Sequence, residues 1–128
     1  MNTPRFAAPE AIFRPDLIKE GDETPGVHEL AYKSITECDL DVRTDLYKNI
    51  ICSGGTTLYE GFPERLSKEL DAKCPQSGVV NVIAPADRYY SVWTGGSTLC
   101  SLATFESQWI TKDEYEENGA EIVHRKCQ

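Results

Sequence analysis

The stretch IICSGGTTLYEGF, residues 50–62, has the composition in this sequence that best suits ligand chemistry. Gly54, Gly55 and Gly61 follow a β-branched, strand-like run, and two threonines directly follow the glycine pair. A strand, a glycine turn and a helix in succession can present backbone N–H groups to an anion such as phosphate. The stretch has neither the GK[ST] ending of a Walker A loop nor the G-x-G-x-x-G spacing of a dinucleotide loop. Taken locally, the glycines favour a plain connecting turn, with an anion-binding turn as the alternative.

Two other places carry groups that could transfer protons. Asp39 and Asp41 flank Leu40, and at this spacing their carboxylates point apart in a helix and to one side in a strand. Their simpler interpretation is a helix cap and a solvated charge. His28 has no serine or cysteine nucleophile in an identifiable partner motif, so a structural histidine is favoured over a catalytic one. The residues themselves predict no catalytic group.

Composition and charge narrow the classes of function. The chain has 128 residues and a formal net charge of −8, and without a basic patch this charge disfavours nucleic acid as a partner. Its five cysteines have no zinc-ligand spacing, so we expect free thiols in a reducing compartment and no metal site. The sequence shows no signal pattern, and no apolar run approaches the ~20 residues of a membrane span. These features predict a cytoplasmic protein without a membrane partner.

Helix and strand patterns alternate around these residues, which predicts an α/β protein. The predicted elements are a short helical piece from Pro9 to Pro15, a helix over 25–37, a short helix capped by Asp39 or Asp41, a strand over 49–53, a helix from Pro63, a strand over 79–85, a helix over 91–102 capped by Ser91, a helix over 112–117 with a Thr111–Glu114 capping box, and a turn over 120–125. A third strand is considered near Arg5 and Phe6. Gly95 and Gly96 predict close backbone packing. A sheet of two or three strands is narrow for an independent domain, which suggests that the chain is part of a larger fold.

Several long runs resemble actin and occur in the same order as in that family. They are GVHELAYKSI, CDLDVRTDLY, LYKNIICSGGTTLYEGFPERL, VNVIAPADRYYSVWTGGSTLCSLATF, QWITKDEY and IVHRKC. The resemblance extends from Arg5 to Cys127 and corresponds to the C-terminal third of an actin-fold protein. FRPDLI and EYEENGA are similar to centractin, an actin-related protein, whereas SGGTT, YSVW and HRKC are similar to conventional actin. We therefore favour a divergent actin and keep a centractin-like protein as the near alternative.

The resemblance implies part of the α/β fold shared by actin, hexokinase and Hsp70 ATPases, in which ATP or ADP with Mg²⁺ lies between two lobes. Residues 1–90 would be an inner-lobe, subdomain 3-like segment, and residues 91–128 would be C-terminal helices of the outer, subdomain 1-like lobe. The family's phosphate-, metal- and water-positioning segments lie in the first two thirds of that fold, which this sequence does not match. The chain is therefore interpreted as a truncated product, a fragment or a partial gene model, and turnover of ATP by this chain alone is disfavoured but left open.

The resemblance also assigns nucleotide-binding residues. They are Gly54, Gly55, Thr56, Leu58, Tyr59 and Tyr89. Actin usually has methionine where Leu58 stands, a volume-conserving change. Tyr89 stands where actin has a lysine on the adenine side of the nucleotide. Its ring could stack on a base, but the positive charge of the lysine is lost.

Two surfaces for protein partners are implied as well. Asp39 and Asp41 match acidic residues that meet the next subunit of an actin filament. The cleft in which actin-binding proteins insert an amphipathic helix is matched by Leu99, Leu102, Thr104 and Gln108, and Gln108 replaces a methionine there. The loop IKEGDETPG is longer and more acidic than the corresponding actin loop. The resemblance thus predicts a cytoskeletal protein whose partners are actin-family subunits and actin-binding proteins, with a truncated module that caps filaments as the second hypothesis.

Overall fold

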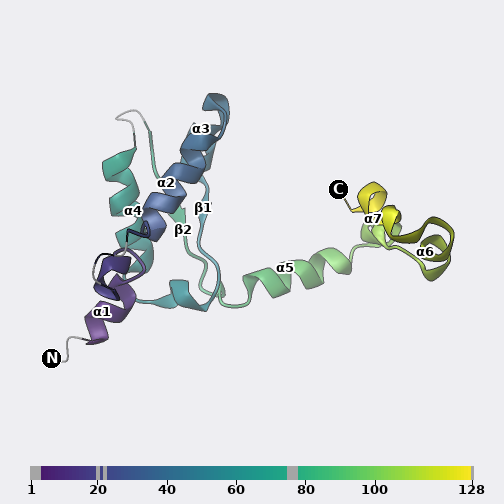
Figure 1. The fold of residues 1–128 in the computed structure, drawn as a ribbon, viewed down its shortest axis with the longest axis horizontal. Helices are drawn as coiled ribbons and strands as arrows, with labels where there is room; N and C mark the ends of the chain where they lie inside the picture. The colour runs from purple at the N-terminus through teal and green to yellow at the C-terminus, as the bar shows by residue number, and fades with distance from the viewer. Residues whose placement is uncertain (1–3, 20, 22, 75–77, 128) are drawn as a thin grey trace. The chain divides into compact units, whose positions relative to one another are not determined.

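The structure is a computed structural model that describes residues 4–19, 21, 23–74 and 78–127 (Figure 1). Contacts within the chain divide it into two compact units, Met1–Tyr89 and Tyr90–Gln128. Glu20 and Asp22, which contribute to the acidity expected of the loop IKEGDETPG, lie outside the described residues.

In the first unit, helices surround a short parallel sheet. The elements are α1 (Pro4–Glu10), α2 (Val27–Glu37), α3 (Leu40–Lys48), β1 (Ile50–Ile51), the 3₁₀ helix η2 (Gly55–Leu58), α4 (Phe62–Lys73) and β2 (Val82–Ile83), with a further 3₁₀ turn, η1, at Pro15–Leu17. Ile50 pairs with Val82 and Ile51 with Ile83. The two paired residues in each strand are fewer than the predicted 49–53 and 79–85. In the described part of the chain, these two residue pairs are the only ones in regular strand pairing.

The core of this unit is built on α4. Gly61 enters the helix with φ 78°, and Phe62, Leu66 and Leu70 recur every four residues on one face. All three side chains are buried, Leu70 completely, and they cluster with Phe13 and Cys52. Burial of each large apolar side chain stabilises the fold by about 1.5–3 kcal/mol. The predicted helix from Pro63 is therefore confirmed, and it packs against the sheet through β2.

A close backbone contact joins the segment before α2 to the core. The amide of Val27 donates to the Ile12 carbonyl at 3.0 Å. A Cβ atom on Gly26 would lie 2.1 Å from the Phe13 carbonyl oxygen, so this position requires glycine. Helix α2 accordingly begins at Val27 with Gly26 as its N-cap, two residues after the predicted start at residue 25.

The N-terminal segment differs from the expectation. Residues Pro4–Glu10 form helix α1, so the strand considered near Arg5 and Phe6 is wrong, and the helical piece begins before the predicted Pro9. A single strand needs a neighbour to satisfy its backbone groups, whereas a helix satisfies them internally. Proline in the first turn suits a helix, because the N–H that it lacks would have no partner there.

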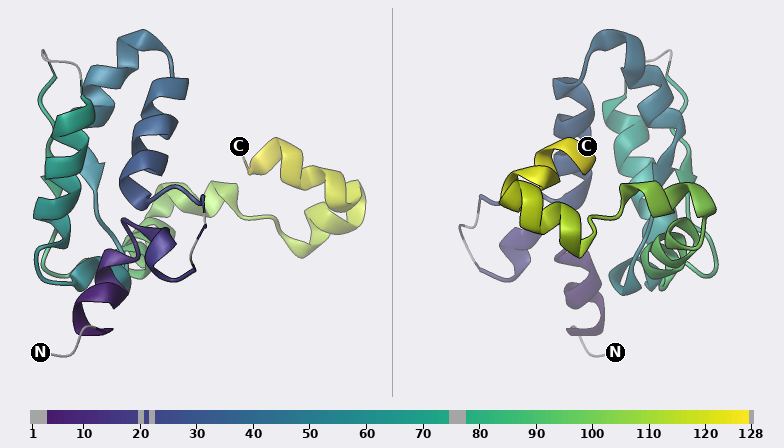
Figure 2. Two further views of the ribbon diagram at one scale, coloured as in Figure 1. Left: turned by 60° about the vertical axis from the view of Figure 1, so that its left-hand side comes forward. Right: turned by 90° about the vertical axis from the view of Figure 1, so that its right-hand side faces the viewer.

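The second unit is a series of short helices, shown from two further directions in Figure 2. They are α5 (Ser91–Cys100), η3 (Ala103–Gln108), α6 (Lys112–Asn118), η4 (Gly119–Glu121) and α7 (Ile122–Lys126). The predicted capping box is confirmed, because the Thr111 hydroxyl accepts from the Glu114 amide at 3.2 Å and the Glu114 carboxylate accepts from the Thr111 amide at 2.9 Å. No described atom lies within 4 Å of a Cβ placed on Gly95 or Gly96. The close packing predicted there is wrong.

Candidate functional site

The glycine turn follows β1 directly and is held in one conformation by its own hydrogen bonds. Gly54 has φ 88° and ψ 161°, a region open essentially to glycine alone. The Gly54 carbonyl accepts from the Thr57 hydroxyl at 2.8 Å and from the Thr57 amide at 3.2 Å. These bonds close the chain into η2 and fix the direction in which the turn faces.

Arg88 clamps this turn to the segment that follows β2. Its backbone carbonyl accepts from the Gly54 amide at 2.9 Å. Its guanidinium donates to the Thr57 hydroxyl at 3.1 Å, to the Thr57 carbonyl at 3.0 Å and to the Pro85 carbonyl at 2.9 Å. The rigid fork of guanidinium donors suits such a set of acceptors. One residue thus ties together two segments that are 31 positions apart.

Sequence reasoning missed both Arg88 and Thr57. No local motif marks an arginine that reaches a turn so far back in the chain. The only local signal was the position of Arg88 directly before Tyr89, one of the predicted residues.

The ring of Tyr89 lies against Gly55. A Cβ atom on Gly55 would lie 2.9 Å from Cε2 and 3.2 Å from Cδ2 of that ring. Any larger residue at position 55 must therefore displace the tyrosine. Tyr89 as a residue stays 54% exposed, so part of its surface is available to a ligand.

The structure brings the predicted nucleotide-binding residues together in the first unit. Gly54 precedes η2, Gly55, Thr56 and Leu58 lie in it, Tyr59 follows it, and Tyr89 packs on it. Thr56, Leu58 and Tyr59 are exposed. No described atom lies within 4 Å of a Cβ built on Gly54, so the backbone is open to an approaching group at that position.

The strand before the turn contributes a neutral thiol. Cys52 is 5% exposed, and burial raises the pKa of its thiol above the usual range more strongly than the positive charge of Arg88 lowers it. Its amide donates to the Ile83 carbonyl at 2.8 Å, which extends the pairing of β1 with β2 toward the turn. The Cys52 thiol adds no charge to the site, and the charged group that contacts the turn is the guanidinium of Arg88.

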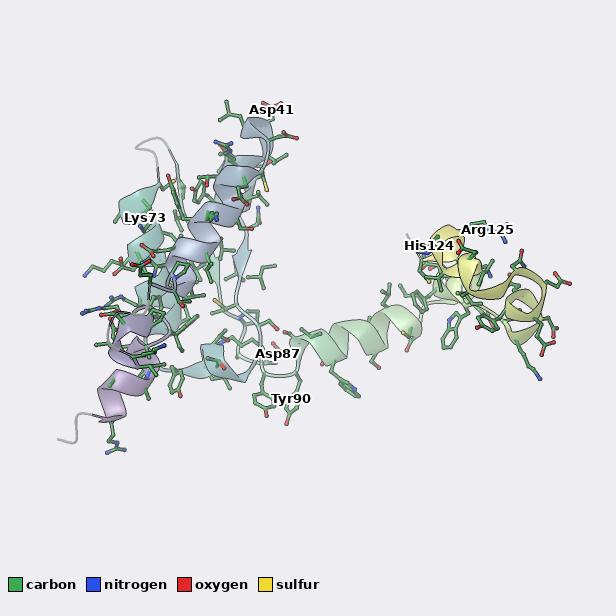
Figure 3. All side chains as sticks on the ribbon, in the orientation of Figure 1. Asp41, Lys73, Asp87, Tyr90, His124 and Arg125 are labelled. Carbon is green, nitrogen blue, oxygen red and sulfur yellow. The ribbon has the colours of Figure 1, made fainter. Side chains whose placement is uncertain are left out.

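The predicted filament residues lie at the start of α3. Asp39 is the N-cap of that helix and Asp41 lies in its first turn, but neither carboxylate caps the helix with a hydrogen bond. Both residues are exposed, and Figure 3 shows Asp41 at the end of α3 away from the sheet. In the described ranges these two carboxylates have no ion pair either.

The residues predicted for the partner cleft lie in the second unit. Leu99 is near the end of α5, Leu102 precedes η3, and Thr104 and Gln108 lie within it. All four are exposed. A hollow of about 560 Å³ is lined by Leu102, Trp109 and Ile110 among others, and Leu102 is the one predicted residue on its described wall.

The described residues hold neither a metal-binding cluster nor a membrane-spanning helix. No three or more His, Cys, Asp or Glu side chains in those ranges gather as a metal-binding group. None of the helices described is both long enough and apolar enough to cross a membrane.

Helices around a parallel sheet, with a glycine turn directly after the first strand, define an α/β protein whose turn exposes backbone to a ligand. The family model described as Actin matches residues 1–128, and the chain therefore belongs to the actin family. Its helix-rich structure with a small parallel sheet is part of an actin-type α/β fold. Members of this family generally bind ATP with Mg²⁺ and are typically cytoskeletal, with actin subunits and actin-binding proteins as partners.

Proposed function

We propose that the chain is an actin-like cytoskeletal protein whose glycine turn forms one wall of an ATP- or ADP-binding cleft. The observation that carries this proposal is the clamp of Arg88 on the turn, which places Tyr89 against Gly55. In the same proposal, the first unit belongs to the inner lobe of the family fold and the second unit to the outer lobe.

Each residue of the wall has a distinct role in this proposal. The open backbone at Gly54 receives the sugar and phosphates, because no described atom lies within 4 Å of a Cβ placed there, and Gly55 leaves room for the Tyr89 ring beside it. The exposed rings of Tyr59 and Tyr89 offer stacking surfaces for adenine, and such stacking contributes about 1–3 kcal/mol per base. Thr56 supplies a hydroxyl and Leu58 an apolar contact.

The same residues do not suit the metal. Mg²⁺ prefers oxygen ligands, above all carboxylates, and the residues from Ser53 to Tyr59 include no aspartate or glutamate. We therefore assign nucleotide binding to this chain and derive no step through Mg²⁺. No catalytic residue is assigned.

A titration with a fluorescent ATP analogue tests the nucleotide wall. We expect saturable binding by the full chain, and an increase in Kd of about tenfold or more in Gly55→Val, whose side chain takes the place of the Tyr89 ring. Gly96→Ala is the matched control, because open space surrounds that helical glycine and affinity should not change. Circular dichroism would verify that both variants fold. Equal affinity of the Gly55→Val variant and the native chain would contradict the proposal.

The second part of the proposal is a filament contact through Asp39 and Asp41. Two exposed carboxylates without partners in the described ranges can pair with basic groups of another subunit. The alternative function, a truncated regulatory module that caps filaments, uses the same surface. The cleft residues Leu99, Leu102, Thr104 and Gln108 remain proposed contacts for an amphipathic helix of an actin-binding protein.

Elongation of actin filaments measured with and without the chain separates these functions. A capping module should slow elongation, and Asp39→Asn with Asp41→Asn should abolish that effect, whereas Asp113→Asn on α6 should preserve it. A subunit that assembles should instead pellet with actin. A centractin-like protein should assemble with copies of itself and leave actin elongation unchanged. If the chain neither pellets nor alters elongation at saturating concentration, the filament proposal is wrong.

A further inference from the structure

A second pocket of the first unit shares no residue with the glycine turn. It has a volume of about 360 Å³ and lies where α2, α3 and the end of α4 meet. Tyr32, Leu40, Arg43, Thr44, Tyr47 and Cys74 line it. The volume is within the range of pockets that bind small molecules, about 300–1,000 Å³.

Tyr47 leaves a buried hydroxyl group without a partner in this pocket. The residue is 4% exposed, and no hydrogen bond to its hydroxyl occurs among the described residues. Burial raises the pKa of this phenol, so it stays protonated at neutral pH and is available as a donor. Native structures rarely leave a buried polar group unpaired, so the unpaired hydroxyl of a residue that lines this pocket indicates a missing partner.

Arg43 supplies the complementary charge. Its Nε donates to the Cys38 carbonyl at 2.9 Å, which fixes the side chain in place. In the ranges that the structure describes, its two terminal nitrogens have no hydrogen bond and it forms no ion pair. Arg43 lines the same pocket as Tyr47, so both polar side chains border the space that a ligand would occupy.

We propose that this pocket binds a small monocarboxylic acid with an aromatic or branched body. The carboxylate accepts hydrogen bonds from the free guanidinium nitrogens of Arg43, which match its geometry, and from the Tyr47 hydroxyl. The body of the acid packs against the Tyr32 ring and Leu40. A single cation with apolar neighbours suits a monoanion better than a phosphate dianion, whose second charge would have no partner. This binding is independent of the nucleotide wall.

Benzoate is the probe, followed by amide chemical shifts of the full chain labelled with ¹⁵N. We expect saturable shifts at Tyr47, Arg43 and Cys74, binding about tenfold weaker for benzamide, which lacks the charge, and none for inorganic phosphate. Concentrations on the order of 10 mM would saturate a millimolar site. Benzamide binding as tightly as benzoate, shifts confined to other residues, or no saturable shift would overturn the proposal.

Substitutions test separately whether the Tyr47 hydroxyl and the Arg43 guanidinium bind the carboxylate. Tyr47→Phe should weaken benzoate binding about fivefold and leave the thermal midpoint unchanged or higher, because it removes an unpaired buried hydroxyl. Arg43→Gln should abolish binding, and Arg43→Lys, which keeps the charge, should retain part of it even if the glutamine variant is unstable. Lys33→Gln on α2, whose charge pairs with Glu37 outside the pocket, is the control. Unchanged affinity in Tyr47→Phe would mean that the hydroxyl holds only a water molecule and would overturn its assignment.

Discussion

Arg88 shows at the level of a single residue why the glycine turn has a defined shape. Backbone turns rich in glycine are conformationally free, and their ordering has an entropic cost. Here the donors of one guanidinium and the carbonyl of the same residue bind four groups of three residues, Gly54, Thr57 and Pro85. The turn is therefore ordered before any ligand arrives, which favours ligand binding.

Arg88→Lys tests this account of the turn. Lysine carries the charge but lacks the forked set of guanidinium donors, so it loses most of the hydrogen bonds to Thr57 and Pro85. We expect the free energy of unfolding to fall by about 1–3 kcal/mol and the Kd for an ATP analogue to rise. Urea unfolding and the nucleotide titration measure the two effects.

The control for this substitution is Arg14→Lys. Arg14 is exposed and pairs with the likewise exposed Asp16, so the change should leave the free energy of unfolding nearly unchanged and should not alter nucleotide affinity. If Arg88→Lys behaves like the control, Arg88 does not order the turn.

Short elements of the second unit depend on polar contacts, because this unit buries little apolar surface. Lys126 of α7 donates to the Trp109 carbonyl at 2.7 Å and contacts the Glu114 carboxylate at 2.6 Å. Glu114 also closes the capping box of α6. One carboxylate thus joins the start of α6 to the end of the chain that the structure describes.

This arrangement predicts a dependence on pH. The hydrogen bond from Lys126, followed by that from the Thr111 amide, lowers the pKa of Glu114. A carboxyl group with a lower pKa in the folded state stabilises the fold above its unfolded pKa and loses that contribution as the pH falls through the folded pKa. Amide protection factors in α6 and α7, which correct for the slower intrinsic exchange in acid, should fall as the pH drops, and Glu114→Gln should make them low and less dependent on pH. Protection factors that do not change in acid in the native chain would contradict this prediction.

Particular elements show how far the sequence determines this structure. The four-residue apolar spacing and Pro63 predicted α4, and the Thr111–Glu114 pair predicted the capping box of α6, because both signals are local. Helix α1 was missed because its strand-like assignment depended on a neighbouring strand that the described residues do not supply. The clamp of Arg88 on Thr57 and the pocket at Tyr47 join residues far apart in the chain, and no local pattern records such contacts. The nucleotide residues were predicted as a group by resemblance to actin, not by their spacing.

At the level of the whole molecule, large apolar side chains remain exposed. Val92 and Trp93 of α5 are 77% and 74% exposed, and Ile51 of β1 is 67% exposed. A hollow of about 550 Å³ beside Trp93 is lined by Tyr90 and Thr94. Exposed apolar surface of this kind promotes association.

We therefore predict that the chain associates with itself at increasing concentration. Light scattering after size exclusion should show a mass that rises with concentration, and Trp93→Gln should reduce it more than Leu30→Gln, whose side chain is 50% exposed on α2. A monomeric profile at every concentration, together with a cooperative thermal transition, would show that these surfaces do not drive association.

The most direct test of the account is hydrogen exchange of the full chain with and without ATP. If the glycine turn is a wall of a nucleotide cleft, ATP should slow exchange of the amides over residues 53–59 and 86–90. Exchange in α6 and α7 should not change, and the Gly55→Val variant should show no protection at the turn. Protection by ATP confined to other segments, or equal protection of the turn in the native chain and the variant, would contradict the assignment of this turn to ATP.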